Sequence, residues 1–254
     1  MKLSLGPVHS LILLCLLITI ELFQAFGAPV GDINISIKTP CGGPVTITTA
    51  NKKTSKETIS QLLILVNEAN SLAGTSKLEA SIHSINSLKL ILYISTLRTV
   101  YFTGFIKMTQ AIGSYDMIMF LDSLKIFNTI NAEEIKAGLD IKKSLGQLFK
   151  SNFGNFSELV IYTDLAAGDA AASHAINIKA VLNKFWTILC ELQIGTLSQG
   201  ESITQYLNTS IISNQVLLVT SPEEILFRNY IIIRDVRKNL EQFSLLYKYI
   251  KDTL

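Results

Sequence analysis

The run from Ser221 to Leu254 constrains this chain most, because it predicts one long amphipathic helix. Ser221 can cap the first free N–H groups, Pro222 suits the first helical turn, and Glu224 occupies the capping-box position. From Ile233, apolar residues recur at steps of three and four, and Leu226 lies one heptad earlier; the recurring residues are Ile233, Val236, Leu240, Phe243, Tyr247 and Ile250. An isolated helix cannot cover such a stripe in water, so other long helices must pack against it.

The first 27 residues have the pattern of a secretory signal peptide. Lys2 supplies the positive end, residues 11–20 the apolar run, and Ala25-Phe26-Gly27 a small-x-small cleavage site before Ala28. An apolar run of this length is too short to span a bilayer. We therefore expect residues 1–27 to be removed and the mature protein to be secreted and extracellular, with no stable membrane anchor.

Charge and composition narrow the classes of partner. The chain has 22 basic and 20 acidic residues, and this near-neutral balance argues against nucleic acid as the main partner. The high hydrophobic fraction of 48% indicates a well-filled helical core. It is also compatible with an apolar cavity, or with a surface that later meets a membrane or a partner. We expect one helical bundle domain at 54–254, preceded by an extended arm at 28–53.

Two cysteines remain after the predicted cleavage, because Cys15 leaves with the signal peptide. In an oxidising compartment, Cys41 and Cys190 are expected to form a disulfide that closes a loop of about 150 residues. The alternative is a buried free thiol, since Cys190 lies in a largely apolar stretch at 186–192.

Three Asn-x-Ser/Thr sequons begin at Asn34, Asn155 and Asn208. Each falls in or beside a segment that we predict to be non-helical. Behind a signal peptide, such surface sequons are acceptors for N-linked glycans, so we expect at least one to be glycosylated.

The predicted arm does not have a helical pattern. Ile33, Ile35 and Ile37 alternate with polar residues, and residues 45–49 alternate in the same way. The Pro- and Gly-rich stretch at 40–44 separates them. This pattern predicts two short extended stretches, either as a hairpin pinned through Cys41 or as a flexible arm.

The first half of the bundle domain predicts two helices. A capping box from Thr54 to Glu57 opens a helix that ends at Gly74. A second capping box at Ser76 opens a helix that runs to about Phe102. That helix is apolar on all sides from residue 90 to residue 94, which is typical of a central element.

The middle of the chain predicts less regular helices. A third helix begins at Ser114, and a fourth begins at Asn131 with a continuity that Gly138 and Gly146 weaken. Residues 152–155 are predicted to form a turn. Residues 157–167 are predicted to form one or two helical turns.

The last third predicts a strong helix that Asp169 opens and Gly195 ends. The connection at 195–220 is long, so the two helices that it joins can run parallel. Within it, residues 216–220 are predicted to form a strand or a packed extended loop. The chain is thus predicted to be all-α, a bundle with four principal long helices plus shorter helices and an extended N-terminal arm or hairpin.

No motif indicates an enzyme. His83 and His174 lie on different predicted helices, and neither has Cys, Asp or Glu neighbours at metal-ligand spacing. The sequence contains no His-Glu-x-x-His motif, no Cys-x-x-Cys motif and no phosphate-binding glycine loop. We therefore predict a protein without catalytic residues, metal or cofactor.

The segment Ile232–Glu241 has an aliphatic-Arg-acidic-aliphatic pattern followed by basic residues. It resembles the last helix of the long-chain four-helix cytokines of the interleukin-6 and ciliary neurotrophic factor class. The resemblance implies an up-up-down-down bundle that brings receptors together, with receptor contacts on the last helix. It makes Arg234, Arg237 and Lys238 candidate contact residues, although a solvated helix face has the same pattern.

Three functions fit these predictions. The first is a secreted, glycosylated, cytokine-like ligand that acts through a cell-surface receptor protein. The second is an extracellular carrier of a small apolar ligand, in a cavity lined by residues 90–94 with Tyr101 and Phe102. The third is a membrane-active secreted helical toxin.

Overall fold

A computed structural model describes residues 37–49, 52–75, 78, 124–126, 128–170, 172–207, 209–212, 214–217, 219 and 222–254. Within these ranges the protein is helical and has no β-strand, so the all-α prediction is confirmed for them. The signal peptide, Asn34, Asn208, His83 and the apolar segment at 90–94 lie outside the described residues. So do the helices predicted to begin at Ser76 and Ser114, apart from residues 78 and 124–126.

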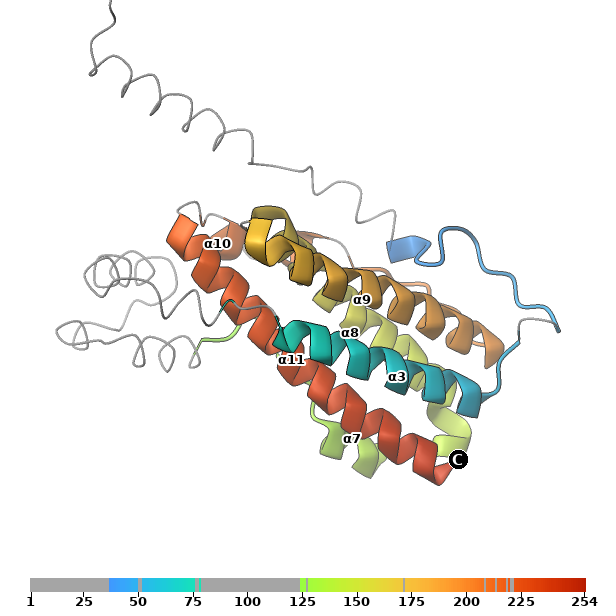
Figure 1. The fold of residues 1–254 in the computed structure, drawn as a ribbon. Coiled ribbons are helices and arrows are strands. Elements are labelled where there is room, and N and C mark those ends of the chain that lie inside the picture. Colours follow the sequence, from blue (N-terminus) through green and yellow to red (C-terminus); the bar gives the residue numbers. More distant parts are fainter. Residues whose placement is uncertain are drawn as a thin grey trace, which may run out of the picture.

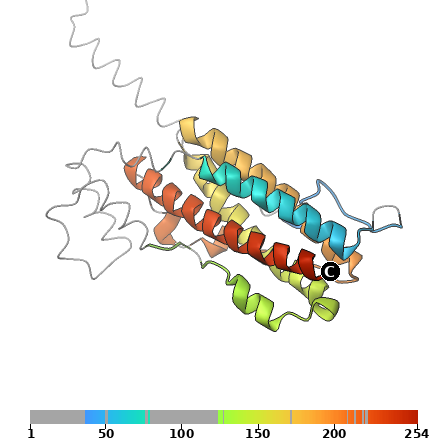
Figure 2. The ribbon, with the colours of Figure 1, turned by 60° about the horizontal axis from the view of Figure 1, so that its bottom comes forward.

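Long helices dominate the described residues (Figure 1). They are α3 (Ser55–Gly74), α8 (Ile141–Asp169), α9 (Ala172–Ser198) and α11 (Pro222–Thr253). The shorter elements are α7 (Ala132–Gly138), the 3-10 turn η1 (Thr209–Ile211) and α10 (Asn214–Leu217). Helix α3 packs against α9 and α11, and α8 packs against the same two helices from the other side (Figure 2).

Helices α3 and α9 run antiparallel. Lys53, just before α3, forms an ion pair of 2.7 Å with Glu191 near the end of α9. At the other end, the Asn177 amide early in α9 donates a hydrogen bond of 2.8 Å to the carbonyl of Thr75, just after α3. The two helices therefore meet along their full length.

Helices α8 and α11 also run antiparallel. The Asn152 amide donates to the Tyr247 hydroxyl at 3.0 Å, and the Asn229 amide donates to the carbonyl of Ala166 at 3.2 Å. Because only residues 170 and 171 join α8 to α9, these two helices turn back on each other. It follows that α9 and α11 are parallel, as the long connection between them predicts, and that α3 and α8 share the opposite direction.

The capping box of α3 is present as predicted. The hydroxyl of Thr54 accepts from the Glu57 N–H at 3.2 Å, and the Glu57 carboxylate accepts from the Thr54 N–H at 2.8 Å. The bond from the Thr54 N–H, together with a bond of 2.8 Å that the Thr54 hydroxyl donates to the same carboxylate, lowers the pKa of the Glu57 carboxyl. The helix continues to Gly74, where the sequence predicts its end.

Aromatic side chains form the centre of the core. The ring of Phe156 in α8 stacks on Phe243 of α11, with ring centroids 4.3 Å apart. The same ring meets Phe185 of α9 edge-on, with centroids 5.8 Å apart. All three residues are completely buried. The middle of α8 is therefore the point at which three helices are packed together.

The predicted turn at 152–155 is wrong, because α8 continues through it. Asn152 is buried and its amide is bonded to Tyr247. The hydroxyl of Ser157 donates to the carbonyl of Phe153 at 2.7 Å, within the helix. Packing of the flanking aromatic residues thus overrides the weak helix propensity of Asn, Gly and Ser. The separate helical turns predicted at 157–167 belong to the same helix.

Gly195 does not end α9, which continues to Ser198. A Cβ atom at Gly195 would lie 2.7 Å from Cγ2 of Thr58 and 3.2 Å from the ring of Phe149. Glycine therefore stands at this position because α9 closely approaches both α3 and α8. The predicted start of this helix is also wrong, since Asp169 ends α8.

The connection between α9 and α11 contains η1 and α10. Residues 216–220 are predicted to form a strand or a packed extended loop, and this is wrong for residues 216 and 217, which belong to α10. Residue 219 is not in a strand, and residues 218 and 220 lie outside the described residues. Val216 is buried there, and its carbonyl accepts from the Arg228 guanidinium at 3.4 Å. A tertiary contact with α11 thus holds this short helix.

In the described part of the N-terminal arm, residues 37–49 and 52–53, the prediction of an extended arm is wrong at residues 37 and 38, which are helical. No described residue of the arm lies in a strand, so the hairpin alternative is not found there. Ile33 and Ile35 lie outside the described residues. The predicted disulfide joins Cys41 to Cys190 in α9, with an S–S distance of 2.07 Å. It fastens the arm to the bundle across a sequence separation of 149 residues.

Candidate binding face on the terminal helix

The three predicted receptor-contact residues differ in how far their side chains are exposed to solvent. Arg237 and Lys238 are exposed on α11. Arg237 is paired with Glu241 at 3.4 Å, and both side chains are about half exposed. In contrast, the Arg234 side chain keeps only 10% of its surface exposed. Only Arg237 and Lys238 are therefore available to a partner, and the burial of Arg234 argues against its predicted role.

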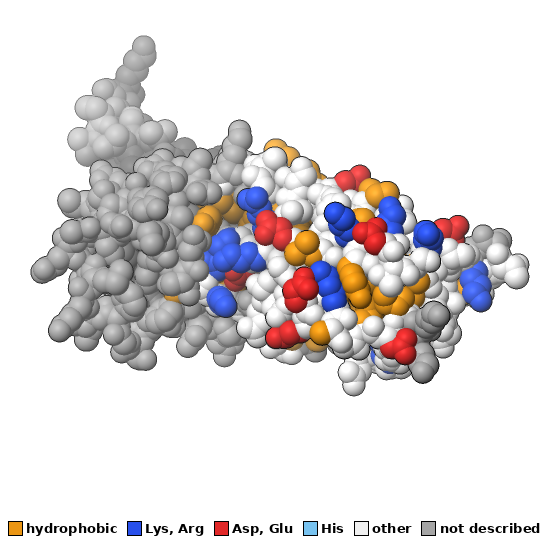
Figure 3. Space-filling view, turned by 90° about the horizontal axis from the view of Figure 1, so that it is seen from below, with side chains coloured by type: hydrophobic (Ala, Val, Ile, Leu, Met, Phe, Trp, Pro, Cys, Tyr) orange, Lys and Arg blue, Asp and Glu red, His pale blue; other side chains and the backbone are white. Residues whose placement is uncertain are grey.

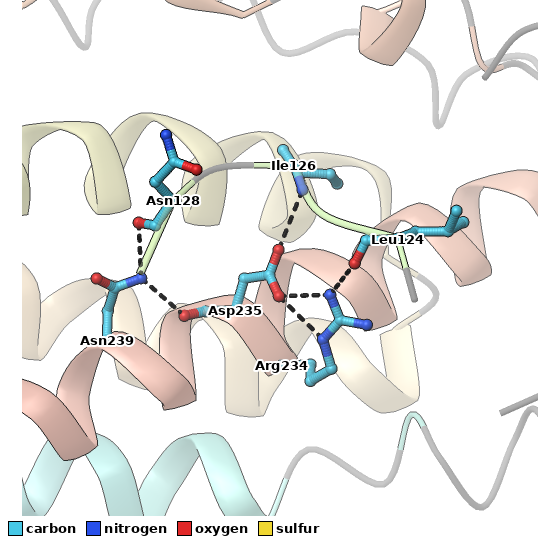
Figure 4. A network of polar contacts seen from close by, with 6 residues as sticks. All are labelled: Leu124, Ile126, Asn128, Arg234, Asp235 and Asn239. Carbon is cyan, nitrogen blue, oxygen red and sulfur yellow. Dashed lines mark hydrogen bonds and ion pairs between the residues drawn. The ribbon is translucent and has the colours of Figure 1, made fainter. Parts of the chain in front are cut away.

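Arg234 has an internal role (Figure 4). Its Nε atom donates to the carboxylate of Asp235 at 2.9 Å, and its guanidinium also donates to the carbonyl of Leu124. Asp235 is buried, and its second oxygen accepts from the Ile126 N–H at 3.1 Å. A buried carboxylate needs a charge partner and hydrogen bonds, and Arg234 supplies the charge. The pair anchors the segment that begins at Leu124.

A row of polar side chains extends from Asp235 along α11. Asp235, Asn239 and Gln242 are spaced four and three residues apart, so they share one side of the helix. We call these three residues the α11 ladder. Each accepts a hydrogen bond from the backbone of the segment formed by residues 124–126 and 128–132, which we call the strap. The accepting contacts are Asp235 with Ile126 at 3.1 Å, Asn239 with Ile130 at 3.0 Å and Gln242 with Ala132 at 3.1 Å.

Asn239 is the central member of the ladder and is only 2% exposed. Besides accepting from Ile130, its amide donates to the carbonyl of Asn128 at 3.4 Å and to the carbonyl of Asp235 at 3.0 Å. It thus bonds both a donor and an acceptor of the strap backbone, and Figure 4 shows the contact with the acceptor, the Asn128 carbonyl. The sequence signal for the ladder is a row of polar residues inside an otherwise apolar helix side, and our sequence analysis did not identify it.

The strap leads directly into α7. Asn131 caps α7, because its side chain accepts from the Glu133 N–H at 3.1 Å and from the Glu134 N–H at 3.4 Å. Helix α7 packs against α11, and the Nζ of Lys136 lies 5.5 Å from the ring centroid of Tyr249. The ladder and α7 therefore occupy adjacent parts of α11.

An exposed face of α11 lies between its contacts with α3 and with α7. On one side, the Ser244 hydroxyl donates to the Asn67 side chain of α3 at 2.8 Å. On the other side, Gln242 bonds the strap. We call the exposed residues between these contacts the terminal-helix face, and they are Arg237, Lys238, Glu241, Leu245, Lys248, Tyr249 and Asp252.

The terminal-helix face combines apolar and charged side chains. Leu245 is 48% exposed and Tyr249 is 39% exposed, one helical turn apart. Figure 3, viewed from the side on which α11 and α7 lie, shows hydrophobic side chains interspersed with charges of both signs. An aromatic and an aliphatic side chain within a charged rim are the arrangement found at the centre of many protein–protein interfaces.

A second buried charge cluster joins α8 to the beginning of α11. Arg228 is buried, and its guanidinium donates to Asp169 at 2.7 Å and to the side chain of Asn229 at 3.0 Å. Asn229 in turn bonds the backbone of α8. Every polar partner of this cluster belongs to the helical framework, so its role is to tie the helix ends together.

Burial also changes the pKa of carboxyl groups on α8. Burial raises the pKa of Glu158 and the pKa of Asp164, and the charge of Lys179 opposes the shift at Asp164. Burial and the charge of Glu158 raise the pKa of Tyr162. These groups lie on α8, away from the terminal-helix face, and they make the stability of the bundle depend on pH.

The described residues contain no group of three or more His, Cys, Asp or Glu side chains that could hold a metal ion. His174 lies near the start of α9. Among the described helices, none combines the length and the apolar composition needed to cross a membrane. The absence of catalytic activity stays a prediction.

The sequon at Asn155 lies inside α8, where a non-helical segment is predicted. Asn155 is half-buried, and Ser157 of the same sequon is completely buried. Glycosylation at Asn155, and at Asn34 and Asn208 outside the described residues, stays a prediction.

Comparisons of the chain with protein-family models, with curated proteins and with solved structures find no match. A functional assignment therefore rests on the chain's own residues and on their geometry.

Proposed function

We propose that this protein is a secreted, glycosylated ligand that binds a cell-surface receptor through the terminal-helix face. The observation that carries the proposal is the exposure of Leu245 and Tyr249 within a rim formed by Lys238, Glu241 and Lys248. The other apolar side chains of α11 from Ile225 to Ile250 are buried or half-buried. A partner protein can bury the two apolar side chains and pair with the charges around them.

The helix directions support a cytokine-like architecture. In chain order, α3 and α8 run one way, and α9 and α11 run the other way. We propose that these four are the principal helices of an up-up-down-down bundle, which the resemblance of the terminal helix implies. The long connection before α11 and the short link between α8 and α9 fit this order.

Secretion is part of the proposal. The N-terminal 27 residues have the pattern of a cleavable signal peptide. The disulfide between Cys41 and Cys190 supports an oxidising compartment, because such bonds persist mainly outside the cytosol. Arg237 and Lys238 are retained as candidate contact residues, and Arg234 is assigned to the interior.

The test begins with expression of the full chain in a secreting cell line. We expect the protein in the medium to begin at Ala28 and to lose mass on enzymatic removal of N-linked glycans. The labelled protein is then added to a panel of cell types. Saturable binding that excess unlabelled protein displaces is the expected result.

A pair of matched variants connects that binding to α11. Leu245→Asp introduces a charge at the centre of the terminal-helix face and should weaken saturable binding by at least tenfold. Ile176→Asp makes the same kind of change on α9, where Ile176 is 74% exposed, and should leave binding unchanged. Equal effects of the two variants, or binding that never saturates, would contradict the proposal.

The same preparation distinguishes the other two predicted functions. In native mass spectrometry, an excess mass of lipid size that disappears on denaturation would favour the carrier. Release of a trapped dye from lipid vesicles would favour the membrane-active toxin. A native mass equal to that of the bare polypeptide, with intact vesicles, is the result expected for a receptor ligand.

A further inference from the structure

The strap is attached to α11 through its backbone. Among the described residues of the strap, the backbone groups that bond α11 belong to even-numbered residues, and they are the carbonyls of Leu124 and Asn128 and the N–H groups of Ile126, Ile130 and Ala132. The backbone bends at Ile126, and on its C-terminal side this alternation is what a non-helical, extended backbone gives, because the polar groups of every second residue then point to the same side. The strap therefore presents one edge of its backbone to α11.

We propose that Asn239 is a positioning residue that sets the register of the strap and thereby places α7 beside the terminal-helix face. This inference rests on the proposed function, because it assigns one edge of the receptor-binding surface to Lys136 and Tyr249. Asn239 itself is buried and does not contact the partner.

The chemistry of an amide explains why asparagine suits this position. Its oxygen accepts from the Ile130 N–H, while its nitrogen donates to the Asn128 carbonyl. A carboxylate can accept but cannot donate, and an apolar side chain can do neither. A shift of the strap by one residue would turn both backbone groups away from Asn239. This pair of hydrogen bonds therefore selects a single register.

The register determines where α7 begins. Ala132, the first residue of α7, is bonded to Gln242, and Asn131 caps the helix. One turn further, Lys136 reaches the ring of Tyr249. If the strap slips, Lys136 leaves Tyr249, and the terminal-helix face loses one of its edges.

The experiment uses the full secreted chain with the substitution Asn239→Ala. We expect the amides of Ile126 and Ile130 to exchange hydrogen at least tenfold faster, while amides in α3 and α9 keep their protection. The ε-methylene protons of Lys136 lie near an aromatic ring, and their ring-current shift should disappear in the variant. Saturable binding to cells should weaken at least threefold, as it should for Lys136→Ala.

Two further variants keep the test decisive. Gln242→Ala removes a single strap bond at a half-buried position, so it remains informative if Asn239→Ala does not fold. It should produce the same changes at a smaller size. Ser244→Ala removes one side-chain bond of α11 on the α3 side and should leave the strap amides and the Lys136 shift unchanged.

The outcomes separate this inference from the proposed function. Unchanged exchange at Ile126 and Ile130, or full binding after the Lys136 shift is lost, would overturn the role of Asn239. If the unmodified protein shows no saturable binding, the proposed function fails, and with it the assignment of a receptor-binding edge. In that case the exchange rates and the Lys136 shift still decide whether Asn239 positions α7.

Discussion

The two buried sides of α11 hold their neighbours by different physical means. Toward α8, the ring of Phe243 stacks on Phe156, and the contact is apolar. Toward the strap, the α11 ladder bonds backbone groups one at a time. Apolar packing is non-directional and grows with the area buried, whereas a hydrogen bond depends on position and angle. The first contact holds the bundle together, and the second contact sets a register.

This difference predicts how each side responds to mutation. A large-to-small substitution in the core leaves a cavity between helices that pack together. It therefore lowers the free energy of unfolding of the whole bundle. Loss of one hydrogen bond between the α11 ladder and the strap is expected to affect only the strap. Net contributions of single hydrogen bonds are about 1 kcal/mol, which is enough to open a segment without unfolding a domain.

The largest expected effect comes from Phe156→Ala. This substitution removes the ring that contacts α9 and α11 and should lower the free energy of unfolding by about 3–5 kcal/mol. Urea denaturation followed by circular dichroism measures it. The control Ile176→Ala, on the exposed surface of α9, should change the free energy by about 0.5 kcal/mol or less. A loss no larger than that of the control would contradict the central role of this ring.

A smaller effect is expected where the buried carboxylate of the ladder loses its charge. Asp235→Asn removes the buried carboxylate that pairs with the Arg234 guanidinium, and it should lower the free energy of unfolding by about 1.5–3 kcal/mol. The matched control is Glu241→Gln, which neutralises the exposed partner of Arg237 and should cost less than about 0.5 kcal/mol. Urea denaturation of both variants gives the comparison, and equal losses would contradict the internal role of the Arg234 pair.

The next effect tests how closely the helices approach on the apolar side. Gly195→Ala places a methyl group against Thr58 and the Phe149 ring, and it should destabilise the protein by about 1–3 kcal/mol. Gly154→Ala in α8 is the control, because no atom lies within 4 Å of the added carbon. It should stabilise the protein by about 0.5–1 kcal/mol through helix propensity. Opposite shifts of the thermal midpoint are the expected measurement, and shifts of the same sign would be inconsistent with this packing.

The smallest effect concerns the pH dependence of stability. Burial raises the pKa of Glu158 above its ordinary value of 4.5, so the folded state favours the protonated form. Below pH 4.5 the carboxyl is protonated in both states, and its ionisation destabilises the folded state increasingly as pH rises through the folded pKa. Glu158→Gln should therefore raise the thermal midpoint at pH 7 and leave it unchanged at pH 3. A thermal midpoint at pH 7 that is lower in the variant than in the unmodified protein would contradict this prediction.

Helix ends with local signals could be predicted from the sequence. The capping box at Thr54 marks the beginning of α3, because capping involves residues within one turn of each other, and α11 begins at Pro222, where the sequence places its first turn. The pairing of Cys41 with Cys190 followed from their number and from the predicted compartment. The length of the connection between α9 and α11 permitted these helices to run parallel, and the structure shows that they do.

Helix interiors with breaker residues could not be predicted in this way. The segment 152–155 has the composition of a turn, yet it lies inside α8 because Phe153 and Phe156 pack in the core on either side of Gly154. Gly195 likewise resembles a helix end, although it marks the closest approach of α9 to α3. In both cases the deciding contact comes from a residue more than 50 positions away in the chain.

The sequence by itself determined that α11 is a long amphipathic helix that needs other helices around it, because periodicity and capping are local properties of the chain. Only the tertiary structure decided what each of its polar residues does. Arg234 and Lys238 are four residues apart and both basic, yet one is buried beneath the strap and the other lies in solvent. The reason is that the exposure of a side chain depends on which segment covers it, and the strap joins α11 from about 110 residues away.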